Sequence, residues 1–262
     1  MFAAVFFCSV LLVDMANAYV AIINKCDNTK IHVVPVPSKV KIDGKLDDWD
    51  MSGAILMYMD EGSKDKYSHR AMMMYGSDAL YVAGHIKDTT PLINNHSFGG
   101  KVDFAWDADA VQLRLFSDPT HKSMYSSMGG GVKNMPKEEQ KKICHITMWY
   151  SNIDKKSGFH IVYTLSFQDP QVNPDGVKGA YCKDADGKGY TYEYSIPYNV
   201  IRVPRPYRGG DKFQVQFQTH WGKSKGEGLR CGMTDLRNPA GFQDLGYHGP
   251  RNRSRGSKSE IA

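Results

Sequence analysis

A late segment of the chain carries three glutamines and a histidine at every second position. Alternate residues of an extended strand point to opposite faces, so this spacing gathers the polar side chains on one face. The polar set is Gln214, Gln216, Gln218 and His220, and the opposite set is Phe213, Val215, Phe217 and Thr219. A row of amides offers donors and acceptors without charge, which suits the neighbouring hydroxyls of a sugar ring. A plain solvent-facing surface or an amide ladder between strands is the alternative interpretation.

A second segment places an aromatic side chain before an alternating strand. Trp106 precedes the run Ala110–Phe116, in which Gln112 and Arg114 alternate with apolar residues. The apolar residues are Val111, Leu113 and Leu115. They are expected in a core, with Gln112 and Arg114 on the face that Trp106 borders. A tryptophan here either closes the core or offers a flat apolar surface for a ligand ring.

Residues for hydrolytic chemistry are few. Glycoside hydrolysis needs two carboxylates about 5 Å or about 6.5 to 9.5 Å apart across a cleft. Asp107 and Asp109 border the Trp106 segment, but residues this close in sequence more readily cap turns. The chain has no Gly-x-Ser-x-Gly elbow, phosphate-binding loop or His-Glu-x-x-His motif. We therefore expect a protein without enzymatic activity, with glycoside hydrolase as a lesser alternative.

Short β-rich runs separated by turn signals must position these residues. They recur without long helical periodicity, which predicts an all-β fold, a single antiparallel β-sandwich of the jelly-roll kind with long loops. The runs are Ile31–Val36, Arg70–Tyr75, Leu80–Ile86, Ala110–Phe116, Ile143–Tyr150, Phe159–Leu165, Val177–Cys182, Tyr190–Ser195 and Phe213–Trp221. Asp186 and Gly187 predict a hairpin turn. Long loops are expected over Asp118–Lys142, with a helical turn near its end, and over Gly222–Asn238.

Several motifs occur in an order that resembles the family 9 carbohydrate-binding modules, which share a β-sandwich with the wider DOMON-like domains. The motifs are Ile42–Trp49, Leu80–Asp88, Trp106–Leu115, Tyr192–Tyr198 and Thr234–Leu245. The resemblance runs from about Val40 to about Tyr247. It implies a DOMON-like sandwich and non-catalytic binding of a polysaccharide or its chain end, of xylan, cellulose or algal type.

The resemblance also implies roles for single residues. Trp106 matches the family's sugar-stacking tryptophan, Gln112 stands where the family has a sugar-binding acid, and Gln216 matches a ligand-binding glutamine. In the closing loop, Thr234 replaces a sugar-binding asparagine and Leu236 replaces a second stacking tryptophan. The candidate carbohydrate-binding residues are Trp106, Gln112, Arg114, Gln216, Gln218, His220, Thr234, Arg237 and Asn238.

Cofactors are the least determined part. Family members often hold structural calcium, and the cluster Asp43, Asp47 and Asp48 is the candidate ligand set. Other DOMON-like domains bind b-type haem for electron transfer through methionine with histidine or lysine. The 13 Met and 9 His, including Met72–Met74 and Met148, keep that alternative open. Methionines in strands more often fill cores, and the glutamine row suits a porphyrin face poorly.

The two ends are expected to differ from the middle. An apolar run before Ala16, Asn17 and Ala18 predicts a signal peptide over residues 1–18 and export to the periplasm, cell surface or beyond. This run is too short to span a bilayer. Residues 19–248 form the sandwich, and residues 249–262 a basic tail expected to be disordered. Charges are otherwise interspersed, so the net charge of +5 does not indicate a nucleic-acid partner.

The cysteine count fits an exported protein. Beyond the predicted leader the chain has Cys26, Cys144, Cys182 and Cys231. An even number in an oxidising compartment predicts two disulfides, whose pairing the sequence leaves open. No Cys-x-x-Cys spacing indicates a structural zinc site.

Overall fold

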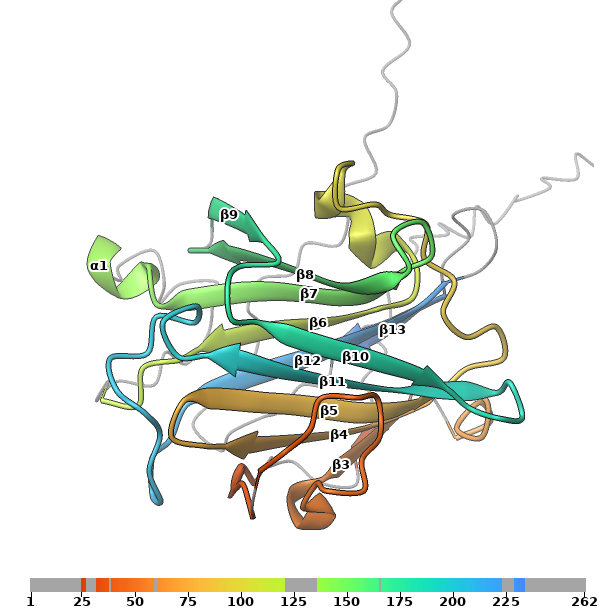
Figure 1. The fold of residues 1–262 in the computed structure, drawn as a ribbon, viewed down its shortest axis with the longest axis horizontal. Coiled ribbons are helices and arrows are strands. Elements are labelled where there is room, and N and C mark those ends of the chain that lie inside the picture. The colour runs from red at the N-terminus through yellow and green to blue at the C-terminus, as the bar shows by residue number, and fades with distance from the viewer. Residues whose placement is uncertain are drawn as a thin grey trace, which may run out of the picture.

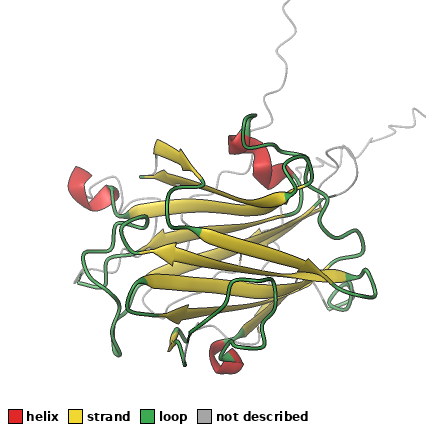
Figure 2. Cartoon of the chain, viewed as in Figure 1, coloured by secondary structure: helices red, strands yellow, loops and turns green. Residues whose placement is uncertain are grey.

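Two β-sheets stacked face to face make up the fold (Figure 1). The computed structural model describes residues 25–26, 32–37, 39–58, 61–120, 136–164, 166–222 and 229–233. In this part of the chain, helices are limited to the short η1 (Met51–Gly53), η2 (Val102–Asp107) and α1 (Lys137–Gln140), as Figure 2 shows. None of the helices described could reach across a bilayer. The predicted all-β sandwich is confirmed.

The first sheet has seven described strands in the order β1-β3-β4-β5-β11-β10, with β2 beside β4. The strands are β1 (Lys25–Cys26), β2 (Val34–Pro35), β3 (Ile55–Tyr58), β4 (Ser68–Tyr75), β5 (Ala79–Lys87), β10 (Lys178–Lys183) and β11 (Gly189–Pro197). Neighbours run antiparallel except for β2 and β4, which run parallel.

The second sheet has six described strands in the order β13-β12-β6-β7-β8-β9, all antiparallel. The strands are β6 (Ala110–Phe116), β7 (Ile143–Ser151), β8 (Lys156–Tyr163), β9 (Gln168–Val172), β12 (Gln214–Trp221) and β13 (Leu229–Met233). β6 and β12 lie side by side, so the two segments that carry the candidate residues are neighbours.

The strand predictions hold for the long strands and miss short ones. β1, β3, β9 and β13 were not predicted, and β13 lies inside the stretch expected to be the loop Gly222–Asn238. That expectation is wrong, because pairing with β12 makes an extended strand of residues whose own pattern is weak. The hairpin at Asp186–Gly187 is confirmed: Gly187 has a φ of 70° and its N–H donates to the Asp184 carbonyl at 3.0 Å.

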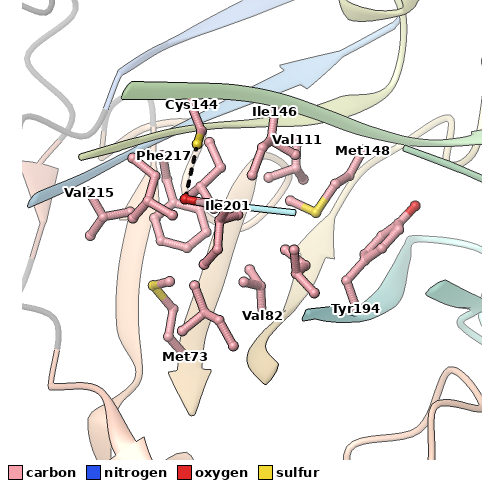
Figure 3. Packing of buried hydrophobic residues seen from close by; sticks show 14 of the residues in the cluster. Met73, Val82, Val111, Cys144, Ile146, Met148, Tyr194, Ile201, Val215 and Phe217 are labelled. Atoms are coloured by element: carbon pink, nitrogen blue, oxygen red, sulfur yellow. Dashed lines mark hydrogen bonds between the residues drawn. The ribbon is translucent and has the colours of Figure 1, made fainter. Parts of the chain in front are cut away.

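The inward faces of the two sheets form the main core. Figure 3 shows Met73 and Val82 of the first sheet opposite Val111, Ile146 and Phe217 of the second. Polar groups within the core are hydrogen-bonded to one another: His69 Nδ1 lies 2.7 Å from Thr219 Oγ1 and Nε2 lies 3.0 Å from Tyr192 OH. Burial lowers the pKa of His69 to about 3. The residue is therefore a neutral hydrogen-bonding link across the core.

The N-terminal segment covers the outer face of the first sheet. Trp49 packs there on Met72, Met74 and Ala83, with Val34, Val36, Val40, Ile42 and Leu46 around them. Met73 and Met148 lie in the main core instead. The methionines that had kept haem as an alternative are thus core-packing residues.

A buried carboxylate fixes the turn Ile42–Trp49 to this face. Glu193 of β11 accepts hydrogen bonds from Trp49 Nε1 at 2.8 Å and from the backbone N–H groups of Asp43 and Gly44. Gly44 has a φ of 89°, and a Cβ there would come within 2.9 Å of the Tyr181 backbone. Two motifs far apart in sequence therefore meet through Glu193.

The predicted pair of disulfides is wrong, because Cys144 and Cys182 are both free. Cys144 points from β7 into the core, where its Sγ lies 3.6 Å from the Ile201 carbonyl (Figure 3). Cys182 is exposed on β10, at the edge of the other sheet. The side chains of Cys26 and Cys231 lie outside the described part, as do the predicted leader and basic tail.

Candidate functional site

The outward face of the second sheet carries a patch of polar side chains that we name the polar face. It consists of Gln112, Arg114, His145, Thr147, His160, Gln216, Gln218 and His220. The strand register sets two rows side by side. One row runs Gln218, Gln112, Thr147 and His160, and the next runs Gln216, Arg114 and His145.

The polar face is recessed from solvent. His145 is partly buried, and each of the other polar-face residues is no more than 8% exposed. An outward strand face usually holds solvated polar groups, whereas a buried polar group needs a hydrogen-bond partner. The expected amide row therefore exists, but it is not a plain solvent surface.

Some of these groups satisfy one another and others do not. Gln112 Nε2 donates to Thr147 Oγ1 at 3.2 Å, and His220 Nε2 donates to Gln112 Oε1 at 3.2 Å. In contrast, Gln216 Oε1, His145 Nε2 and His160 Nε2 are buried without a hydrogen-bond partner in the described structure. Each such atom costs about 1 to 3 kcal/mol unless a ligand or water completes it. The polar face is therefore suited to a ligand rich in donors and acceptors.

The helix η2 forms one edge of the polar face. Residues three apart in a 3₁₀-helix share a side, so Val102 and Ala105 both face the sheet, where they pack against Trp149. Phe104 is left 48% exposed, and Trp106 is partly exposed. The Trp106 ring centroid lies 6.4 Å from that of Phe104 and 6.1 Å from that of His220. Trp106 is thus an edge residue of the polar face and not part of the core.

Apolar side chains also border the opposite edge. Phe167 is 56% exposed and its ring centroid lies 5.3 Å from that of His145. Val172 of β9 is opposite His160 and is also exposed. Of the four exposed large apolar side chains in the described residues, Phe104, Phe167 and Val172 border the polar face. Most of the exposed large apolar side chains in the described residues are therefore found around the polar face.

Asp107 and Asp109, the two carboxylates considered for a hydrolase, stabilise the fold through hydrogen bonds. Asp107 Oδ1 accepts from His96 Nε2 at 2.6 Å, which holds η2 against the preceding loop. Asp109 is buried and accepts the backbone N–H groups of Ile93, at 2.7 Å, and Gly222. Both carboxylates are thus engaged in contacts of the scaffold.

The titratable groups of the polar face are held towards their neutral forms. The pKa of His145 lies well below its usual value, because burial desolvates the ring and because Arg114, His160 and His220 repel an added charge. Burial also lowers the pKa of His160, while Asp103, whose Oδ1 lies 3.3 Å from His160 Nε2, acts to raise it. Burial therefore favours the neutral imidazole at both His145 and His160.

The structure brings together most of the residues predicted from sequence. Gln112, Arg114, Gln216, Gln218 and His220 share the polar face, with Trp106 at its edge. Thr234, Arg237 and Asn238 lie outside the described residues. Sequence reasoning missed His145, Thr147 and His160, although each alternates with inward residues such as Ile146 and Ile161. That alternation is the signal that could have found them.

The aspartates suggested as calcium ligands shape a turn. Asp43 pairs with Lys41 Nζ at 2.7 Å and accepts the Lys45 N–H at 3.1 Å, and Asp48 accepts the Lys41 N–H at 2.7 Å. Asp47 is exposed. In the residues that the structure describes, no three metal-ligating side chains are grouped to hold an ion. Calcium stays a prediction without a described ligand set.

Three solved structures share the general architecture. A family 9 carbohydrate-binding module from Caldicellulosiruptor kristjanssonii, in complex with cellotriose, is 17% identical, covers 81% of this chain and 91% of its own, and has a TM-score of 0.48. A family 9 carbohydrate-binding module from the same organism, in complex with glucose, is also 17% identical, covers 80% of this chain and 92% of its own, and has a TM-score of 0.47. A candidate carbohydrate-binding protein from Bacteroides uniformis is 9% identical, covers 79% of this chain and 91% of its own, and has a TM-score of 0.45.

No family model and no curated protein matches the chain. At these identities and TM-scores, the solved structures resemble this chain in fold only, so the ligand has to be inferred from the residues of the polar face.

Proposed function

We propose that this protein binds carbohydrate non-catalytically on the polar face. The observation that carries the proposal is a recessed polar surface in which Gln216 Oε1 and His145 Nε2 have no hydrogen-bond partner in the described structure, next to the exposed ring of Phe104 and the partly exposed ring of Trp106. A sugar presents hydroxyls at its edges and C–H groups on its faces. Hydroxyls can both donate to and accept from such groups, and C–H faces stack on aromatic rings.

The other candidates have less support. A b-type haem would need methionine ligands at a cavity, but Met72, Met73, Met74 and Met148 are all packed in apolar clusters. A hydrolase would need two carboxylates facing the substrate, and Asp107 and Asp109 instead hold η2 and the Ile93 loop. The proposed function is therefore that of a binding module. We also propose that the protein is exported, because its N-terminal residues resemble a signal peptide.

A glycan array probed with the purified chain, followed by calorimetry on the best ligand, tests this function. Trp106→Ala should weaken binding at least about tenfold, with little change in melting temperature, because Trp106 is an edge residue. Gln216→Ala should cost about 1 to 2 kcal/mol of binding free energy through lost hydrogen bonds.

Ile153 provides the matched control, because it is exposed but is not among the side chains that border the polar face. Ile153→Ala should leave affinity unchanged. If Trp106→Ala unfolds the protein while the remaining folded fraction binds normally, Trp106 is not part of the site. If no glycan binds the parent chain, the proposed function is wrong.

A further inference from the structure

We propose that the polar face binds a chain of several sugar units and not a single sugar, and that Phe167 provides a second stacking surface at the end away from η2. This inference rests on the proposed function and deepens it. It adds the length of the ligand and a further residue that contacts the ligand.

Aromatic side chains lie at two ends of the polar face. Figure 1 shows the short helix η2, in yellow, and strand β9 towards opposite ends of β8. On η2, Phe104 is 48% exposed, and Phe167, directly before β9, is 56% exposed. The C–H face of a sugar ring can stack on either side chain. The polar face therefore has a stacking surface at each end.

The two ends are too far apart for one sugar ring. The ring centroids of Trp106 and His220 lie 6.1 Å apart, and those of Phe167 and His145 lie 5.3 Å apart. His220 is four residues from Gln216 along β12, and Gln216 lies in the same row as His145. Four residues of a strand span about 14 Å. One ring cannot contact both aromatic side chains, whereas several linked sugars can.

Groups that bind hydroxyls lie between the two ends. Gln216 Oε1 and His145 Nε2 are buried and have no hydrogen-bond partner in the described structure. The neighbouring row, two residues nearer to His220 along β12, contributes the amides of Gln218 and Gln112. Successive sugar units carry hydroxyls along their whole length, so a chain that reaches from η2 to Phe167 would supply partners to both rows.

The backbone at Phe167 adopts a costly conformation. Its φ of 54° lies in the left-handed region, which a bulky residue rarely adopts, and Thr164, Asp169 and Asn173 nearby also have positive φ. The exposed ring recovers little of this cost through burial, and all five residues of β9 are exposed. Costly backbone conformations gather at functional sites, where the surrounding structure maintains them. Phe167 is thus held at an open edge of the polar face, where a ligand can reach it.

Oligosaccharides of increasing length test this inference. Calorimetry would use glucose to cellohexaose, xylose to xylohexaose, and size-fractionated oligosaccharides of any other polysaccharide that binds on the glycan array. In a series that binds, affinity should rise by at least about tenfold from the monosaccharide to the hexasaccharide. Equal affinity for the two would overturn the inference and leave carbohydrate binding intact.

Substitutions at Phe167 test its contact with the ligand. Phe167→Ala should weaken hexasaccharide binding at least about tenfold and leave monosaccharide binding unchanged, because a single sugar next to Trp106 does not reach Phe167. Phe167→Tyr keeps a flat ring and should bind the hexasaccharide as the parent chain does. Ile153→Ala, at an exposed residue outside the site, should leave affinity unchanged at every length. Melting curves check that each variant folds.

The outcomes separate this inference from the function beneath it. If the folded Phe167→Ala variant binds the hexasaccharide as tightly as the parent chain, Phe167 does not contact the ligand. Equal losses for the monosaccharide and the hexasaccharide also overturn the inference, because they place the effect at the first sugar. If Phe167→Ala does not fold, Phe167→Leu, which keeps an apolar side chain without a flat ring, takes its place with the same expectations. Failure of every oligosaccharide and of every glycan on the array removes the proposed function itself.

Discussion

Histidine side chains occupy three kinds of environment in this chain. His69 links Thr219 and Tyr192 inside the core, with both ring nitrogens engaged. His96 fixes η2 through Asp107. His145 and His160, in contrast, each keep a buried Nε2 without a hydrogen-bond partner in the described structure. A buried ring nitrogen without a hydrogen-bond partner therefore distinguishes the histidines of the polar face from those that only stabilise the fold.

Cys144 and Cys182 should react with alkylating reagents at very different rates. Burial raises the pKa of the Cys144 thiol to about 12, whereas Cys182 is exposed. Only the thiolate reacts, so iodoacetamide at neutral pH should label Cys182 in the native protein and Cys144 only after unfolding. Mass mapping of peptides alkylated before and after denaturation measures both sites. Labelling of native Cys144, or recovery of either residue in a disulfide, would contradict the structure.

At the scale of elements, Glu193 joins the N-terminal turn to β11. Replacing Glu193 by Ala leaves three donors, the buried Trp49 Nε1 and Gly44 N–H and the part-buried Asp43 N–H, without their acceptor. We expect the free energy of unfolding to fall by about 2 to 4 kcal/mol in urea titrations. The turn should also become accessible to trypsin at Lys41 and Lys45.

An exposed glutamate provides the control for this change. Glu138 pairs with Lys141 at 2.8 Å on the surface of α1, with its side chain 79% exposed. Such pairs contribute little, so Glu138→Ala should shift stability by no more than about 0.5 kcal/mol. Equal stabilities for the Glu193 and Glu138 variants would mean that the turn is held by Trp49 packing and not by the carboxylate.

From the sequence, the face of a strand on which each side chain lies could be predicted better than which strands lie side by side. Alternation in β6 and β12 correctly divided Gln112 and Gln216 from Leu113 and Phe217, because the period of a strand is local. It could not show that β7 and β8 extend the same face with His145 and His160, since strand order depends on pairing between distant segments. The burial of the polar face was also unforeseen, because the exposed fraction of a side chain depends on segments that are distant in sequence.

At the scale of the whole molecule, a pair of buried aspartates connects the two sheets. Asp88 follows β5 of the first sheet, and Asp109 precedes β6 of the second. Asp88 Oδ1 accepts the Thr90 N–H at 2.8 Å, and Asp109 accepts the N–H groups of Ile93 and Gly222. Burial raises the pKa of both carboxyls, each is among the groups that shift the pKa of the other, and Asp88 Oδ2 has no donor in the described structure. We therefore expect the pair to share a proton, which would give Asp88 Oδ2 a donor.

This shared proton should make the stability of the protein depend on pH. Burial first, and then repulsion by Asp88, raise the pKa of Asp109 to about 8, whereas an unfolded aspartate titrates near about 4. Between these values the folded state binds more protons than the unfolded state, so the contribution of this pair to stability is greatest below about pH 4 and is lost as pH rises towards about 8. Asp88→Asn places an amide donor against Asp109 and removes the repulsion. We expect the free energy of unfolding of the variant, from urea titrations at about pH 8, to exceed that of the parent chain by about 1 to 2 kcal/mol. The variant should also lose less stability than the parent chain from about pH 5 upwards.

An exposed aspartate provides the control. Asp65→Asn, at a carboxylate that is 98% exposed, should have the same stability as the parent chain at every pH. A variant less stable than the parent chain at about pH 8 would show that the fold requires both carboxylates ionised, and that no proton is shared between the sheets.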